Sequence, residues 1–411
     1  MSMSQTPDAP SPAPSDVLTP LSPAEGGGRL RGGNAARRVL VLMFAAAVTS
    51  GTAGLRPGSG LSGGLWLALY AAGFLPGFWL PLLVVRLSSR RVGLAPVLTT
   101  VGVGHWGGST VRHGRLVVFR QVPLLPPVWL LALTEPAVPL GRLRAATAAG
   151  SLLSAVSAAA LLACGGPAAV AGWGAAWAVM MTLATSIIMP GSFVAMLFRP
   201  PSGGAAGLAE LRHGPAELAA VRALAAGRLT AAREALSEPC AEPGASRSLA
   251  EATLALAEGD VEEAARGALR VYRQSRRTER RAGAVRVHAQ ALAEGIAAGR
   301  WTAEQAGPAL DAAVAALRTI HPKLLRVSEL PATLATLNGR THDAVALATR
   351  AAAIAPDALS RARVLAVRAE VLAAAGDGDE ARRALTQARR LAPGLTRTAL
   401  AARTVAPEGT S

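Results

Sequence analysis

The sequence contains little cysteine, almost no lysine and few aromatic residues. Only two cysteines are present, Cys164 and Cys240, which excludes a disulfide framework and a four-cysteine metal site. Lysine occurs once, at Lys323, beside 41 arginines. Such a preference for arginine over lysine is typical of the nucleotide composition of the coding DNA. The net charge of +16 is therefore not evidence of nucleic-acid binding. Aromatic residues make up 4% of the chain but hydrophobic residues 51%, mostly Ala, Leu and Val, which excludes a chain that is disordered throughout.

Acidic residues are nearly absent from one long stretch, since the only one between Val39 and Phe198 is Glu135. Long apolar runs fill this stretch and arginines lie between them, as in a helical membrane domain surrounded by lipid. We therefore predict a membrane domain over residues 39–204, with spans at residues 39–55, 61–87, 145–164 and 168–198. Prolines in the second span, and Pro190 in the fourth, predict kinked or broken helices.

The arginines at the span ends predict the orientation of this domain, because basic residues favour the cytoplasmic side. One side carries eight of them: Arg37, Arg38, Arg86, Arg90, Arg91, Arg142, Arg144 and Arg199. The connections on the other side, 56–60 and 165–167, contain only Arg56. We therefore predict a multi-pass protein of the cell membrane with both termini in the cytoplasm. The terminal residues 1–38 and 401–411 are predicted to be disordered, because they are rich in small and polar residues.

The segment between the second and third spans predicts a small β element. VLTTVGVG and GRLVVFRQV alternate β-branched with small or polar residues around a glycine-rich turn, which is typical of a β-hairpin. The apolar piece at 122–133 contains a Pro-Pro pair, so we predict a re-entrant or interfacial segment there.

Residues 205–400 predict a soluble helical domain with internal repeats. A glycine followed five residues later by alanine recurs at Gly227, Gly259, Gly339 and Gly376, with Gly299 as a weaker member. The pattern resembles the tetratricopeptide repeat, in which a glycine turns two antiparallel helices and small residues let them pack closely. The irregular spacing, the missing large aromatic residue of the first helix and the interrupting Pro331 depart from that family. An ordinary helical bundle is the alternative. The fold class is accordingly all-α: a polytopic membrane domain with a small β insert, joined to a cytoplasmic α-solenoid.

A solenoid leaves a concave surface, and such surfaces usually bind another protein chain. The repeat alignment predicts that Thr333, Arg363 and Glu370 point into this groove as partner-binding residues. The alternative is that all three are merely solvated. The Arg-rich stretch 273–286 predicts a solvated helix face, with contact to anionic lipid headgroups as the alternative.

The order of segments over residues 61–215 resembles the site-2 protease family of intramembrane zinc metalloproteases. The resemblance rests on GFWLPLLVVRLSSRRVG, a β-like segment, QVPLLPP, a long apolar span and SIIMPGSFVAMLFRPPSGG. In that family HExxH supplies two zinc-binding histidines and a water-activating Glu, and a later helix supplies an Asp. Here Gly77, Phe78, Trp79, Leu80 and Pro81 occupy the HExxH positions, and Gly203 replaces the Asp. The resemblance therefore implies a degenerate member without zinc, and a generic membrane anchor is the alternative.

These patterns predict no enzyme, no metal and no cofactor. The histidines are scattered, and His105 and His113 have neither helical nor zinc-finger spacing. The function predicted is a non-catalytic membrane protein whose cytoplasmic repeats recruit a protein partner, with no nucleic acid involved. A pseudoprotease that binds transmembrane segments of client proteins is the alternative. A transporter subunit is disfavoured, because the spans contain no ionisable residue except Arg86 near an end.

Overall fold

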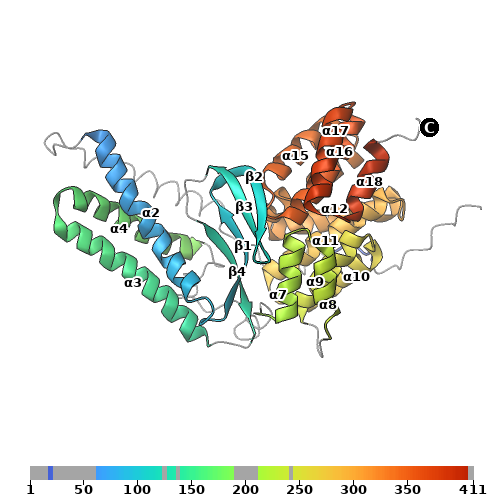
Figure 1. Cartoon of the computed structure of the whole chain (residues 1–411). Coiled ribbons are helices and arrows are strands. Elements are labelled where there is room, and N and C mark those ends of the chain that lie inside the picture. The colour runs from blue at the N-terminus through green and yellow to red at the C-terminus, as the bar shows by residue number, and fades with distance from the viewer. Residues whose placement is uncertain are drawn as a thin grey trace, which may run out of the picture. The chain divides into compact units, whose positions relative to one another are not determined.

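A computed structural model describes residues 17–21, 62–122, 127–135, 139–188, 212–239 and 244–405. The described chain is mostly helical and contains one small sheet, and it forms two compact units (Figure 1). The first predicted span, 39–55, the C-terminal part of the fourth and most of both predicted tails lie outside the described residues.

Three long apolar helices form a bundle, coloured blue to green in Figure 1. They are α2 (Gly63–Leu87), α3 (Leu140–Cys164) and α4 (Gly166–Ile188), and each packs against the other two. The Ser62 hydroxyl caps α2 by accepting a hydrogen bond of 3.3 Å from the Leu65 N–H. This helix runs continuously through Pro76 and Pro81, so the prolines do not break it. Gly165 and Gly166 both have positive φ and turn α3 tightly into α4.

Glycines lie between these helices. A Cβ added at Gly73 would meet the Ala171 carbonyl oxygen at 1.8 Å, and one at Gly174 would meet the Tyr70 carbonyl oxygen at 2.1 Å. Large apolar side chains point outward instead: Leu67 is 64% exposed and Leu152 65% exposed. Small residues inside and leucines outside are the reverse of a soluble bundle and are typical of helices packed in lipid.

Two of the described helices are long and apolar enough to cross a membrane, judged by length and composition: Gly63–Leu87 and Gly141–Cys164. They coincide with the second and third predicted spans. The fourth predicted span begins within α4, two residues after its first residue, Gly166.

The sheet is larger than the predicted hairpin. Its strands are β1 (Leu94–Val101), β2 (Val103–Arg112), β3 (Arg115–Val122), β4 (Val128–Thr134) and β5 (Arg212–His213), in the order β2-β3-β1-β4-β5. The two predicted strand segments, 97–104 and 114–122, lie mainly in β1 and β3, which are neighbours in the sheet. The predicted glycine-rich turn between them is wrong, because most of it is strand β2, which turns into β3 at His113 and Gly114, both with positive φ.

Half of the segment 122–133, for which we predict a re-entrant or interfacial position, belongs to strand β4, and its position at a membrane stays a prediction. This strand pairs antiparallel with β1, from Leu94 opposite Leu133 to Thr100 opposite Val128. The Pro-Pro pair precedes β4 and does not interrupt it. An irregularity in β1 between Pro96 and Leu98 accommodates a proline, which has no N–H to donate.

The second unit contains residues 104–119 of the sheet and a helical domain, yellow-green to red in Figure 1, which we call the helical unit. Its helices are α7 (Pro215–Ala225), α8 (Leu229–Ser237), α9 (Ala245–Glu258), α10 (Val261–Gln274), α11 (Thr278–Ala297), α12 (Ala303–Ile320), α13 (Pro322–Arg326), α14 (Leu330–Leu337), α15 (Thr341–Ile354), α16 (Ala358–Ala374), α17 (Gly378–Leu391) and α18 (Thr396–Val405). Consecutive helices pack together, including α9 with α10, α11 with α12, α14 with α15 and α16 with α17.

The glycines of the predicted repeat lie at the turns between these helices. Gly227, Gly259, Gly299, Gly339 and Gly376 all have positive φ. At Gly259 the backbone is left-handed at φ 91°, and its N–H donates back to the end of α9, which closes that helix. Pro331 lies in the first turn of α14, where a proline costs no hydrogen bond. That these helix pairs are tetratricopeptide-like repeats stays a prediction.

A short N-terminal segment belongs to the same unit. Val17 is fully buried and Leu21 is 9% exposed, and both are members of a core cluster supplied by α9 through α14. Leu18 packs against this cluster from its edge. The prediction of a disordered N-terminal tail is therefore wrong for residues 17–21. The prediction of a disordered C-terminal tail is likewise wrong for residues 401–405, which form the end of α18, where Ala401 is fully buried.

Candidate functional site

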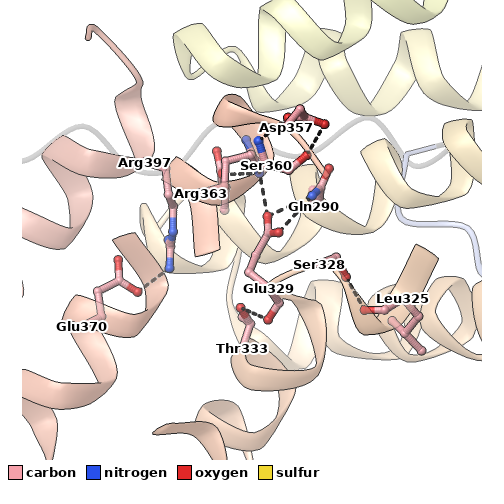
Figure 2. A network of polar contacts seen from close by, with 11 residues as sticks. Gln290, Leu325, Ser328, Glu329, Thr333, Asp357, Ser360, Arg363, Glu370 and Arg397 are labelled. Carbon is pink, nitrogen blue, oxygen red and sulfur yellow. Dashed lines mark hydrogen bonds and ion pairs between the residues drawn. The ribbon is translucent and has the colours of Figure 1, made fainter. Parts of the chain in front are cut away.

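The three predicted partner-binding residues lie in a network of polar contacts inside the helical unit (Figure 2). Arg363, on α16, is 4% exposed, and Thr333, on α14, is 9% exposed. The side chain of Glu370, also on α16, is 19% exposed. The structure thus gives Arg363 and Thr333 internal contacts, and a partner reaches them only if the surrounding helices separate. Their role in partner binding stays a prediction.

Arg363 is the centre of this network. Its Nε donates to Glu329 Oε1 at 2.9 Å, and its Nη2 donates to Glu294 Oε1. The Gln290 amide donates to both oxygens of Glu329, at 2.9 and 3.1 Å. Figure 2 shows Gln290 and Arg363 converging on Glu329 from two different helices. Since Glu294 and Gln290 lie on α11 and Glu329 immediately precedes α14, the network joins three helices.

The pKa values of Glu294 and Glu329 shift in opposite directions, although both carboxylates pair with Arg363. Burial raises the pKa of Glu294, although Arg363 and Arg397 act against this rise. Burial also acts to raise the pKa of Glu329, but Arg363, a backbone N–H and Gln290 together hold it below its usual value. The two carboxylates in turn raise the pKa of Arg363, despite its burial. Arg363 and Glu329 therefore form the charged pair, and Glu294 is the carboxyl group that takes up a proton more easily.

A second buried pair extends the network to α18. Arg397, whose side chain is 4% exposed, donates from Nη2 to Glu370 Oε2. Burial raises the pKa of Glu370 to about 7, even with Arg397 as partner. At the start of α16, Asp357 caps the helix by accepting from the Ser360 N–H at 2.7 Å. The network thus fixes both ends of α16.

The Arg-rich stretch 273–286 does not form a wholly solvated face. Arg277 and Arg280 are each 8% exposed. The guanidinium of Arg281 lies over the Tyr272 ring, 4.5 Å from its centroid. The predicted solvated face is therefore wrong for these residues. The cause is that α11 lies between neighbouring helices.

His288, on α11, is 1% exposed. Burial lowers its pKa to about 4, so the imidazole is neutral at physiological pH. In the sequence His288 belongs to no histidine motif, and in the structure it is a buried residue of the helical unit.

The positions that correspond to HExxH are packed by apolar groups. A Cβ added at Gly77 would lie 2.9 Å from the Ala175 Cα, because α4 covers this part of α2. The Trp79 ring stacks on Trp129 of β4 with centroids 6.3 Å apart. In the described part of the chain, no group of three or more His, Cys, Asp or Glu side chains is arranged to hold a metal ion. The position of Gly203 lies outside the described residues.

No protein-family model, no curated protein and no solved structure matches this chain. The resemblances to the site-2 protease family and to the tetratricopeptide repeat therefore rest on the sequence pattern alone. Sequence reasoning missed Glu294 and Glu329, the two partners of Arg363. They lie 69 and 34 residues from it, and no local motif marks either of them.

Proposed function

We propose that this chain is a non-catalytic, multi-pass membrane protein that holds a protein partner at the cytoplasmic face of the cell membrane through its helical unit. The observation that carries the proposal is the combination of two structures in one chain. One is a helical bundle with glycines inside and leucines outside, which suits a lipid environment. The other is a large domain of stacked helices turned at glycines, an architecture that typically presents a protein-binding surface.

The distribution of arginines supports the proposed orientation. Arg86 lies in the last turn of α2, and Arg142 and Arg144 lie in the first turns of α3. The opposite end of α3 joins α4 through Gly165 and Gly166 and carries no charged residue. Since basic residues favour the cytoplasmic side, the α3–α4 turn is assigned to the outer side and the helical unit to the cytoplasm.

Cys164 tests this orientation, because it is exposed at the end of α3 beside the turn. In a Cys240→Ser background, a membrane-impermeant maleimide is expected to label Cys164 in intact cells. The matched control is a Ser237→Cys change on α8, made with Cys164→Ser and Cys240→Ser. This introduced thiol is exposed and is expected to react only after the cells are permeabilised. Labelling of the α8 thiol in intact cells would show that the helical unit lies outside the cytoplasm and that the proposed orientation is wrong.

Partner recruitment is tested with the full chain in native membranes. We expect a specific protein to co-purify with the intact chain at physiological salt and to be lost when the chain is ended at residue 214. The same protein is expected to leave the membrane fraction in cells that lack the chain. If no co-purifying protein depends on residues 215–411, recruitment by the helical unit is wrong.

A further inference from the structure

The N-terminal segment 17–21, VLTPL, is buried in a domain that begins nearly two hundred residues later along the chain. Val17 is fully buried and Leu21 is 9% exposed, whereas Thr19 and Pro20 between them are exposed. The segment forms a turn, with no helix or strand of its own. Two apolar side chains four positions apart thus anchor a short turn of the chain in a helical core.

The surrounding sequence shows that this contact is local. The flanks, APSD before Val17 and SPAEGGG after Leu21, consist of proline, glycine, small and acidic residues. Residues 17–21 are therefore the apolar part of this region, and their burial has the pattern of a short linear motif in a groove.

The energetics favour a contact that can exchange. Burying two aliphatic side chains is favourable, but fixing the backbone of a short flexible segment costs a comparable free energy. Because the segment is part of the same chain, its rebinding is intramolecular and does not depend on the protein concentration. The same groove is then available to a partner peptide with a similar pattern.

We propose that the groove filled by residues 17–21 is a peptide-binding site of the helical unit, and that this segment is its internal ligand. The partner it fits is a protein with a short unstructured motif carrying aliphatic residues at positions i and i+4. This inference rests on the proposed function, because it names the surface through which the helical unit binds a partner. The internal segment then competes with the partner for that surface.

The same contact constrains the topology. A segment that reaches the core of the helical unit lies on the same side of the membrane as that unit. The chain therefore crosses the membrane an even number of times between Leu21 and the start of α7 at Pro215.

The test uses the full chain in detergent and a fluorescent peptide with the sequence of residues 14–24, PSDVLTPLSPA. The variant Val17→Asp/Leu21→Asp is expected to release the internal segment. We expect the peptide to bind this variant at least tenfold more tightly than it binds the wild type. The matched control, Pro20→Asp, adds a charge at an exposed position and is expected to behave as the wild type does. A peptide with the same two Asp substitutions is expected not to bind.

Other outcomes overturn the proposal. Equal affinity for variant and wild type would mean that the segment does not occupy the site. If the double variant is folded, with an unchanged thermal midpoint, but does not bind the peptide, then the segment is not a ligand. If the double variant is unfolded, a chain lacking residues 1–22 provides the second test. If the peptide neither binds nor stabilises this truncated chain, the segment is part of the core and not a ligand. A wild-type dimer that the double variant converts to a monomer would show exchange between two copies.

The two proposals fail separately. If the peptide binds the variant but no partner depends on residues 215–411, the proposed function fails and the internal ligand stands. If a partner depends on these residues but the peptide does not bind, only the internal ligand fails.

Discussion

Replacing Arg363 with methionine is expected to lower the free energy of unfolding of the helical unit by about 3–5 kcal/mol. The guanidinium holds two carboxylates whose side chains are 4% and 6% exposed, Glu294 and Glu329. Without it, Glu329 is left as a buried charge whose remaining side-chain partner is the Gln290 amide. For a domain of this size the thermal midpoint is expected to fall by roughly 10 °C. Circular dichroism measures the free energy of unfolding by chemical denaturation and the thermal midpoint by heating.

Two further variants make this prediction specific. Arg382→Met removes an arginine that pairs with Asp379 on the surface of α17, where both side chains are largely exposed, so a change of at most about 1 kcal/mol is expected. Glu294→Gln is expected to cost far less than Arg363→Met, because burial already favours the neutral form of this carboxyl group. A loss from Arg363→Met no larger than that from Arg382→Met would show that the buried network contributes little to stability.

The apolar helices were predictable because their signal is local. A lipid-spanning helix needs a continuous apolar run of fixed length, and both GGLWLALYAAGFLPGFWLPLLVVRL and the run before Cys164 meet that requirement on their own. The glycines at the helix turns were detectable for a similar reason. A left-handed turn requires glycine at one position, as at Gly259 and Gly376, whatever the rest of the domain does.

The strand β4 and the buried charges were not predictable because their causes are distant in sequence. VWLLALT is too short and apolar to be distinguished from an interfacial segment, and its pairing with β1 is what makes it a strand. Arg363 likewise resembles any arginine on a helix surface. Its burial depends on Glu294 and Glu329, which three-dimensional packing brings to it from other helices.

Replacing Gly73 with alanine is expected to destabilise the three-helix bundle by about 3 kcal/mol, the upper end of the cost of overpacking. The added Cβ would lie 1.8 Å from the Ala171 carbonyl oxygen, a backbone atom that cannot rotate away. The helices α2 and α4 must therefore move apart, and the close contact between them is lost along its length. Because association in lipid depends on such packing, no hydrophobic gain compensates for the separation. Unfolding in mixed micelles of increasing SDS content, followed by tryptophan fluorescence, measures the loss.

Gly64→Ala is the matched control, since it makes the same chemical change on the same helix. A Cβ at Gly64 has nothing within 4 Å, so the substitution is expected to leave the stability unchanged or to raise it slightly through helix propensity. The contrast between the two alanines separates interhelical contact from backbone flexibility, because both replace a helical glycine. Equal stability of the two variants would mean that α2 and α4 do not approach each other closely at Gly73.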